Sequence, residues 1–479
     1  MDAVTFVFMG FEVTLISIDA LNRTFLLAFA VAGLGALTYA HAMTKDIRHT
    51  LLSAAFIAVS AGTVAAGDFF SFLVFWELMM VISCILLVYD GRVKSVEAGF
   101  RYLLLHVFAG VSLLFAVIIQ YVVTGQMVFA APVVAALPFF IVACAVKGTM
   151  LPFYVWVPDA YSNTMPASAV VLSAFTTKVG VYSVARILGG TIPIAYMGGA
   201  MAVFGVIMAL GQKNLRRLLS FHMVSQVGYM MAGVALGTAA GTDAGTLHLF
   251  NNVMYKTLLF MVAGAVWYRT RAEDTKSLGG LARSMPITFV CGIVGALSIS
   301  GMPPFNGFVS KTMLDYAVGD HTALKVLLFI AGVGTTMSFA KFIWYTFLNK
   351  GEAKAPPVRE VPVSLQVPMV YLALLCLVSG IAYGTVATML PSSTWMAVYE
   401  PMKILKSIAV VVGGVGFFFG IRGLIDSFGY WTVLQPKDLI SRAVDRVATL
   451  SGSFLYRQGE DIHLLVVAFA LVGMIMLFW

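Results

Sequence analysis

The hydrophobic pattern of this chain consists of long apolar runs separated by short polar segments. An α-helix needs about 20 mostly apolar residues to cross the hydrocarbon core of a bilayer. The pattern therefore predicts an all-α polytopic membrane protein with about fourteen transmembrane helices. The runs lie at about 22–43, 50–66, 68–89, 99–122, 132–157, 166–188, 192–210, 218–237, 245–268, 285–318, 322–348, 363–389, 403–421 and 462–479.

Four of these runs contain a lysine, and the lysines form two similarly spaced pairs. Lys178 follows Lys147 by 31 residues, and Lys341 follows Lys311 by 30. An ammonium group at the centre of a bilayer costs roughly 2.5–3.5 kcal/mol even on the scale derived from helix insertion. Lysines retained at this cost in a repeated arrangement indicate an ion path.

Helix-breaking residues lie beside the first lysine of each pair. Lys147 is followed by Gly148–Pro152, and Lys311 is preceded by Gly301–Pro304. Proline removes a backbone hydrogen bond, and lipid cannot satisfy the carbonyl that is freed. Both segments are therefore predicted to interrupt a helix and to face protein or internal water.

The lysine pairs occupy matching places in two blocks of five predicted helices, residues 50–188 and 192–348. Because five is odd, the second repeat must be inverted in the membrane relative to the first, as in many transporters. The other parts are an N-terminal segment with the first helix (1–49), additional transmembrane helices (349–433), an amphipathic lateral helix (434–461) and a C-terminal transmembrane helix (462–479). The amphipathic helix lies along the membrane surface or a neighbouring subunit, or is a simple surface connector.

The composition agrees with a membrane protein, since 60% of the residues are hydrophobic, 11% are charged and the mean hydropathy is +0.93. The four cysteines lie singly in apolar runs, so disulfides, iron–sulfur clusters and structural zinc are not expected. The sequence contains no Walker loop or dinucleotide-binding motif, and it therefore indicates no cofactor and no metal. Acidic residues interrupt the N-terminus, which does not resemble a signal peptide.

The net charge of +8 would suggest a nucleic-acid partner in a soluble protein, but here the basic residues gather in alternate loops. By the positive-inside rule these loops are cytoplasmic. We therefore expect a multi-pass protein of the cell (inner) membrane, with both termini of its membrane domain facing outward and no nucleic-acid partner. The basic loops contain Lys45, Arg48, Arg92, Lys94, Arg101, Lys213, Arg216, Arg217, Arg269, Arg271, Lys276, Arg283, Lys350, Lys354 and Arg359.

Glu77 is an isolated carboxyl group in the middle of an apolar run. Burial favours its uncharged form unless a cation lies nearby, and Lys147 and Lys178 are the candidate partners. Forming and breaking such a pair would switch the lysine between holding and releasing a proton, as a pump requires. The alternative is a static ion pair that fixes helix packing.

His248 and Lys256 lie eight residues apart, about two turns, on one face of the helix predicted at 245–268. His106 and His222 also lie within apolar runs. Histidine titrates near neutral pH and could pass protons between lysines, but each histidine could equally be a hydrogen-bonded core residue. Lys256 and Lys311 are therefore stronger candidates than any of the histidines.

A series of motifs follows in order along the chain. They are Phe75–Met79, Lys147–Pro152 with Trp156–Ala160, Thr177–Tyr182, Ser220–Tyr229, His248 with Lys256–Phe260, and Pro304–Lys311. Together they resemble the antiporter-like subunits of respiratory complex I, of group 4 membrane-bound hydrogenases and of Mrp-type sodium/proton antiporters. The resemblance covers residues from about 11 to 425.

The resemblance implies a subunit that moves protons, or exchanges sodium for protons, within a larger oxidoreductase complex. Redox cofactors would belong to peripheral partner subunits, and sister antiporter-like subunits would lie beside this one, so the chain alone is expected to be non-catalytic. The glutamate and the first lysine would form the switching pair, and the last lysine would release protons outward. The implied path consists of Glu77, Lys147, Lys178, Lys256, His248 and Lys311.

The chain departs from the family pattern in two places. Asn252 stands one turn after His248, where the family often has a second histidine, so a relay there would use water or another donor. Ile18–Leu21 resembles the lead-in to the family's third helix, so the usual first two helices are expected to be absent. Lys311, rather than a glutamate, at the exit position resembles the distal type of subunit.

Other functions stay open from the sequence. The chain could belong to a cofactor-free Mrp-type antiporter, or it could be a structural or coupling subunit whose lysines only position helices. A solitary solute carrier is a further alternative, although no substrate-pocket signature accompanies it. The motifs do not separate proton transport from sodium transport.

Overall fold

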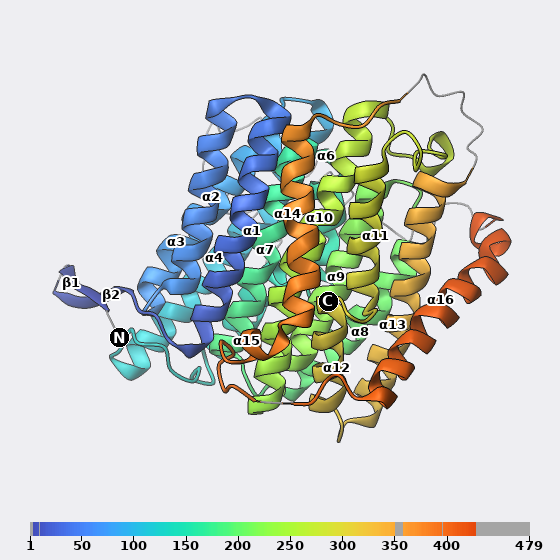
Figure 1. Ribbon diagram of the computed structural model, residues 1–479. Helices are drawn as coiled ribbons and strands as arrows, with labels where there is room; N and C mark the ends of the chain where they lie inside the picture. The colour runs from blue at the N-terminus through green and yellow to red at the C-terminus, as the bar shows by residue number, and fades with distance from the viewer. Residues whose placement is uncertain (1–2, 9, 350–357, 395, 428–479) are drawn as a thin grey trace, which may run out of the picture. The chain divides into compact units, whose positions relative to one another are not determined.

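The computed structural model describes residues 3–8, 10–349, 358–394 and 396–427. Ten helices in this part of the chain are long and apolar enough to cross a membrane, which confirms a polytopic helical membrane protein (Figure 1). They are α1 (Ala20–Thr44), α2 (Ile47–Ala65), α3 (Phe69–Val88), α4 (Val93–Thr124), α7 (Pro166–Ile187), α8 (Ile192–Leu210), α10 (Ala239–Thr270), α13 (Thr322–Ile343) continued by the π-helix η3 (Trp344–Leu348), α14 (Val363–Ile381) and α16 (Pro401–Ser427).

Both predicted helix interruptions are present. The first separates α5 (Leu137–Lys147) from η1 (Phe153–Val155) and α6 (Trp156–Asn163). The second separates α11 (Pro286–Ser300) from α12 (Asn306–Ala317). The other helices are α9 (Leu215–Val234), the short η2 (Thr275–Ser277) and α15 (Tyr383–Ala387).

A β-hairpin at the N-terminus was not expected from the hydrophobic pattern. Strands β1 (Val4–Phe8) and β2 (Phe11–Ile16) pair antiparallel, with Val7 opposite Glu12. The carboxylate of Asp68, the N-cap of α3, accepts a hydrogen bond from the Thr14 backbone N–H at 2.6 Å. The hairpin is thus attached to the start of a transmembrane helix. The predicted lateral helix at 434–461 and the last predicted span at 462–479 lie outside the described residues.

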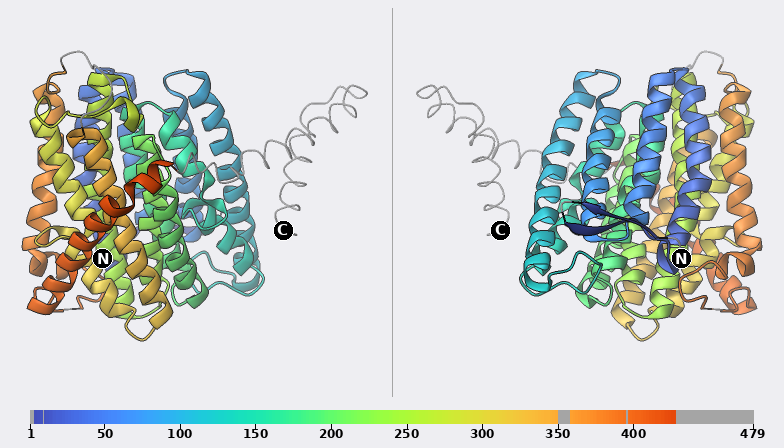
Figure 2. Two further views of the ribbon diagram at one scale, coloured as in Figure 1. Left: turned by 90° about the vertical axis from the view of Figure 1, so that its right-hand side faces the viewer. Right: turned by 90° about the vertical axis from the view of Figure 1, so that its left-hand side faces the viewer.

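The helices α7, α9 and α10 form the centre of the helical array. The membrane-spanning windows of α7 and α10 are buried along their whole length, and α10 packs against α1, α7, α9, α11, α12 and α14 (Figure 1). Figure 1 shows α2 to α4 (blue) on one side of this centre and α13 with α16 (gold to red) on the other, and Figure 2 views the molecule from these two sides. Lys178 of α7 and Lys256 of α10, both fully buried, therefore face other helices and not lipid.

Glycines allow the closest of these helix contacts. A Cβ atom on Gly228 of α9 would collide with the backbone carbonyl of Gly198 on α8, and the reverse substitution would meet the same obstacle. Small residues at membrane helix interfaces let backbones approach closely, and dispersion contacts then hold the pair together. The α8–α9 pair positions the face of α9 that meets the buried lysines.

Candidate functional site

All six predicted path residues are buried or half-buried. Lys147, Lys178, Lys256 and His248 are fully buried, whereas Glu77 and Lys311 are half-buried. They come from five different helices, so none of their contacts follows from local sequence. The environment of each is described in turn.

Glu77 on α3 lies against Gly110 of α4, where a Cβ atom would collide with the carboxyl group. Its charged partner is Lys147, the last residue of α5, with which it interacts electrostatically. The Lys147 Nζ atom lies 4.3 Å from the centroid of the Trp76 ring, a cation–π distance. Within the described residues, neither Glu77 Oε1 nor Lys147 Nζ has a hydrogen-bond partner. The two groups are near one another without a closed ion pair.

Lys178 on α7 has a different environment. Its Nζ atom donates a hydrogen bond to the Ser173 carbonyl oxygen at 2.8 Å and contacts the Met223 sulfur of α9 at 3.0 Å. Of the two candidate partners of Glu77, the structure therefore places Lys147, and not Lys178, beside the carboxyl group. Lys178 instead connects α7 to α9.

Lys256 on α10 also faces α9. Its Nζ atom donates to the Leu219 carbonyl oxygen at 2.8 Å and lies 5.7 Å from the centroid of the Phe339 ring. The ammonium groups of Lys178 and Lys256 are close enough to repel one another. The His222 ring packs on Phe339 at 4.8 Å, and neither of its nitrogens has a partner in the described part of the chain.

His248 is the centre of a hydrogen-bond network that joins α9, α10 and α12. Its Nδ1 atom lies 3.0 Å from the Ser310 hydroxyl, and its Nε2 atom lies 3.2 Å from Gln226 Oε1. The Tyr255 hydroxyl donates to the same Gln226 oxygen at 3.1 Å, and Asn252 Nδ2 donates to Tyr255 at 3.2 Å. His248 and Lys256 thus share the helix face turned toward α9, as their spacing predicted.

Gln226, Tyr255 and Ser310 were not selected as path residues from the sequence. Their signal was present, because each is a polar side chain within a buried helix, and Gln226 lies in the motif Ser220–Tyr229. Polar residues are common in apolar runs, and the sequence does not show which side chain each of them contacts. The partner can therefore be assigned only from the fold. The structure supplies that partner, His248, for two of the three.

Lys311 lies at the second helix interruption. Its Nζ atom is 3.4 Å from the Ser300 carbonyl oxygen, the last residue of α11, and 5.3 Å from the centroid of the Tyr229 ring. A helix C-terminus carries partial negative charge and favours a cation. Lys311 therefore connects the two halves of the interrupted helix electrostatically.

Lys341, the second member of the second spaced pair, has another role. Its Nζ atom donates to the carbonyl oxygens of Leu210 and Gln212 at 2.6 and 2.9 Å. These carbonyls belong to the C-terminal end of α8 and the turn after it, which have no intrahelical donors. Lys341 caps the C-terminal end of α8, whereas Lys178 lies in the core between α7 and α9.

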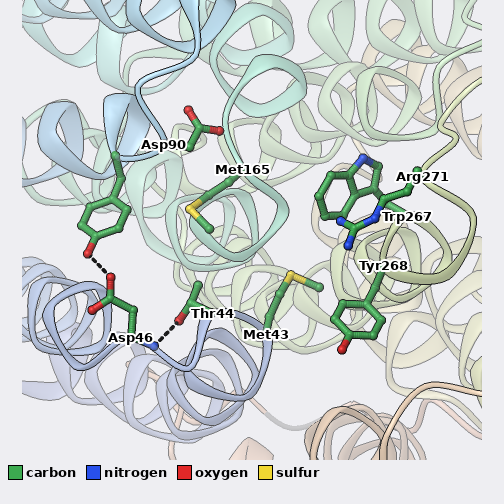
Figure 3. A pocket seen from close by; sticks show the side chains of 9 residues that line it. Met43, Thr44, Asp46, Asp90, Met165, Trp267, Tyr268 and Arg271 are labelled. Atoms are coloured by element: carbon green, nitrogen blue, oxygen red, sulfur yellow. Dashed lines mark hydrogen bonds between the residues drawn. The ribbon is translucent and has the colours of Figure 1, made fainter.

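A pocket of about 370 Å³ lies elsewhere, at the ends of α1, α3 and α10 (Figure 3). In it, the Tyr89 hydroxyl donates to Asp46 and holds the pKa of that carboxyl group below its usual range. The Arg271 guanidinium stacks over the Trp267 ring, 4.4 Å from its centroid. None of the predicted path residues lines this pocket.

The fold and the buried ionisable residues define a helical membrane protein that contains two interrupted helices and buries ionisable side chains in its core. Residues 66–338 match the family described as NADH:quinone oxidoreductase/Mrp antiporter, TM. The chain belongs to this family. It is an antiporter-like membrane subunit, and the resemblance inferred from the motifs is confirmed.

Relatives of the chain include components of both kinds of complex. It is 29% identical over 346 residues to a Na(+)/H(+) antiporter subunit of Alkalihalophilus pseudofirmus, covering 67% of this chain and 70% of the relative. It is 30% identical over 407 residues to an NADH-quinone oxidoreductase subunit of Desulforudis audaxviator, covering 76% and 81%. A solved chain of the membrane-bound sulfane sulfur reductase, an archaeal respiratory membrane complex, superposes with a TM-score of 0.79 at 25% identity, covering 100% of this chain and 92% of that chain.

Proposed function

We propose that this chain moves protons across the cell membrane as one subunit of a redox-driven ion pump of the complex I or group 4 hydrogenase type. The observation that carries the proposal is the series of buried ionisable side chains, running from α3 through α5, α7 and α10 to α12. Intramembrane charges are costly and are retained mainly where they serve ion or proton movement. The path consists of Glu77, Lys147, Lys178, Lys256, His248 and Lys311.

The switch in this mechanism is the distance between Glu77 and Lys147. When the carboxylate approaches, it stabilises the ammonium form and Lys147 holds its proton. When it withdraws, burial favours the neutral amine and the proton passes toward Lys178. Repulsion between Lys178 and Lys256 would then drive the proton onward to His248 and Lys311.

The proposed topology consists of two inverted five-helix repeats, residues 50–188 and 192–348, within about fourteen spans. The interrupted helices α5–α6 and α11–α12, one in each repeat, support this division. The basic loops would face the cytoplasm. The flanking parts of the chain would be the segments 1–49, 349–433, 434–461 and 462–479. The partners of the chain would be sister membrane subunits and peripheral redox subunits.

A second candidate is a component of an Mrp-type cation/proton antiporter without redox activity. The similarity to the Na(+)/H(+) antiporter relative favours it, just as the similarity to the NADH-quinone oxidoreductase relative favours the pump. Mass spectrometry of the intact complex, purified from native membranes through a tag on this chain, separates the two. Iron–sulfur or nickel–iron subunits indicate the redox pump, and small membrane subunits alone indicate the antiporter.

Substitution of Lys147 tests ion translocation itself. Lys147→Ala, and Lys147→Met to preserve the side-chain volume, should reduce proton translocation at least about tenfold while the complex still assembles, because the switching amine is lost. Proton uptake into vesicles containing the purified complex measures this. Lys94→Ala, at an exposed position in the same half, is the matched control. Full translocation by both Lys147 variants would show that the lysine only positions helices.

A further inference from the structure

A second buried polar cluster lies at the interruption between α11 and α12, and its side chains are neutral. Ser298 of α11, Asn306 of α12 and Asn251 of α10 are each at most 1% exposed. The Ser298 hydroxyl, the Asn251 Oδ1 atom and both polar side-chain atoms of Asn306 have no nitrogen or oxygen hydrogen-bond partner among the described residues. A buried polar atom without a partner costs about 1–3 kcal/mol, so four in one place require an explanation.

These three side chains come from α10, α11 and α12, and a fourth helix, α14, packs against them. Asn251 Nδ2 donates to the Asn306 carbonyl oxygen at 2.8 Å, which ties α10 to the start of α12. The Cys376 thiol of α14 lies against both Ser298 and Asn306. Gly307 brings the first turn of α12 onto the last turn of α11, since a Cβ atom there would collide with the Ser298 carbonyl oxygen. The unpartnered oxygens therefore lie in one small region beside the end of α11.

The chemistry of this region suits a small monovalent cation. Its donors are hard oxygens, which prefer alkali and alkaline-earth cations to softer metals. The carboxyl end of α11 adds partial negative charge, and interrupted transporter helices use such ends with unwound carbonyls to hold Na⁺. No carboxylate belongs to the cluster, so a buried divalent ion would remain largely uncompensated. We propose that Ser298, Asn251 and Asn306 form a Na⁺ site at the second helix interruption.

Lys311 makes occupancy of this site conditional. Its side chain packs on Gly301, and its Nζ atom lies near the Ser300 carbonyl at the same helix end. A charged ammonium here repels a cation in the neighbouring site. The site therefore fills when Lys311 is neutral and empties when Lys311 is protonated, which couples Na⁺ to the proton path. This coupling rests on the proposed function, whereas Na⁺ binding itself does not.

Other ionisable groups also surround the site and bear on its occupancy. His248 of α10 reaches α12 through Ser310, and Cys376 faces the site from α14. The Tyr399 hydroxyl, which precedes α16, lies 3.4 Å from the Pro304 carbonyl oxygen. Lys311 is the group among these that carries a full positive charge when protonated and contacts the end of α11.

Sodium titration of the purified whole complex tests the site. The measurements are ²³Na NMR line broadening and the shift of the thermal unfolding temperature, with K⁺ or choline replacing Na⁺ at constant ionic strength. Ser298→Ala, Asn251→Ala and the double variant should weaken Na⁺ binding at least about tenfold, because hard oxygen donors are lost. Ser71→Ala is the control. It removes an unpartnered buried hydroxyl on α3, away from the proposed site, and should leave Na⁺ binding unchanged. Lys311→Gln should tighten binding about tenfold, since it removes the competing charge.

Three outcomes would overturn this site: no saturable Na⁺ binding, binding no tighter than that of K⁺, or a binding component that survives the double variant. The lysine path is judged separately. Loss of translocation in Lys147→Ala without Na⁺ binding leaves the path standing and removes the Na⁺ site. Na⁺ binding with full translocation in Lys147→Ala keeps the site and removes the path.

Discussion

At the scale of single residues, His248 illustrates how a titratable group in a membrane core acquires a defined orientation. One ring nitrogen meets Ser310 and the other meets Gln226, so the imidazole is held from two helices. Tyr255 shares the Gln226 oxygen and connects Asn252 to the network. The Asn252 position, where the family often has a second histidine, therefore still reaches His248 through two side chains.

Gln226→Leu should uncouple this network. It leaves His248 Nε2 and the Tyr255 hydroxyl without their shared acceptor, at a cost of about 1–3 kcal/mol for each group. We expect at least a tenfold loss of proton translocation per assembled complex, measured in vesicles by the decay of an imposed pH gradient. Gln120→Leu is the control, because Gln120 is also buried but bonds only loop backbone at Ala131 and Val133. Equal translocation by the two variants would remove Gln226 from the path.

At the scale of helices, the interruptions depend on close backbone contacts with their neighbours. Gly180 of α7 lies against Lys147 and Gly148, where a Cβ atom would collide with the backbone of the interrupted helix. This contact sets the distance between α7 and the end of α5. It therefore also sets where the Lys147 side chain begins its course toward Trp76.

Gly180→Ala should displace that contact. Overpacking in a well-packed core costs typically about 1–3 kcal/mol, so we expect a lower unfolding temperature and slower translocation. Gly416→Ala in α16 is the matched control, since nothing lies within 4 Å of the added Cβ and alanine favours a helix by up to about 1 kcal/mol. Differential scanning fluorimetry of the purified complex measures both. An unchanged unfolding temperature for Gly180→Ala would contradict the close contact.

At the scale of the whole molecule, an ion pair joins the start of α1 to the end of α7. Asp19 caps α1 by accepting from the Asn22 N–H at 2.9 Å, and it pairs with Arg186 of α7 at 2.6 Å. Burial alone would raise the pKa of Asp19, but the Arg186 guanidinium and the capping N–H groups outweigh it and bring the pKa below its ordinary value of 3.8. A carboxyl group whose pKa falls on folding stabilises the fold above its unfolded pKa and loses that contribution as pH drops through the folded pKa.

The unfolding temperature should accordingly fall as the pH is lowered below about 4, in part through this pair. Asp19→Asn should lower the unfolding temperature at pH 7. It should also reduce the further fall of the unfolding temperature in acid, because the titrating carboxyl group is gone. Scanning fluorimetry between pH 7 and pH 3 measures this, and Arg186→Met, which removes the same pair, should give a similar profile. A wild-type pH profile in both variants would contradict a role for the pair in holding α1 on α7.

The sequence by itself determined the features that depend on residues close together along the chain. Apolar run length specifies membrane-spanning helices, and Gly-Pro segments specify both interruptions, because composition and backbone geometry act locally. The lysines could be assigned to the interior for the same reason, since their cost in lipid is a property of each run. Ten of the fourteen predicted runs contain a candidate span within the described residues, and two more are the interrupted helices.

Only the tertiary structure decided which groups meet. It placed Glu77 near Lys147, gave Lys341 the end of α8, surrounded His248 with Gln226 and Ser310, and gathered neutral oxygens beside α11. Each contact joins residues far apart in the chain, and it depends on how the helices rotate and how closely they pack. Hydrophobic runs specify that a helix crosses the membrane, but they carry little information on which of its faces meets which neighbour. That choice is made by glycine contacts and buried hydrogen bonds, which exist only in the assembled array.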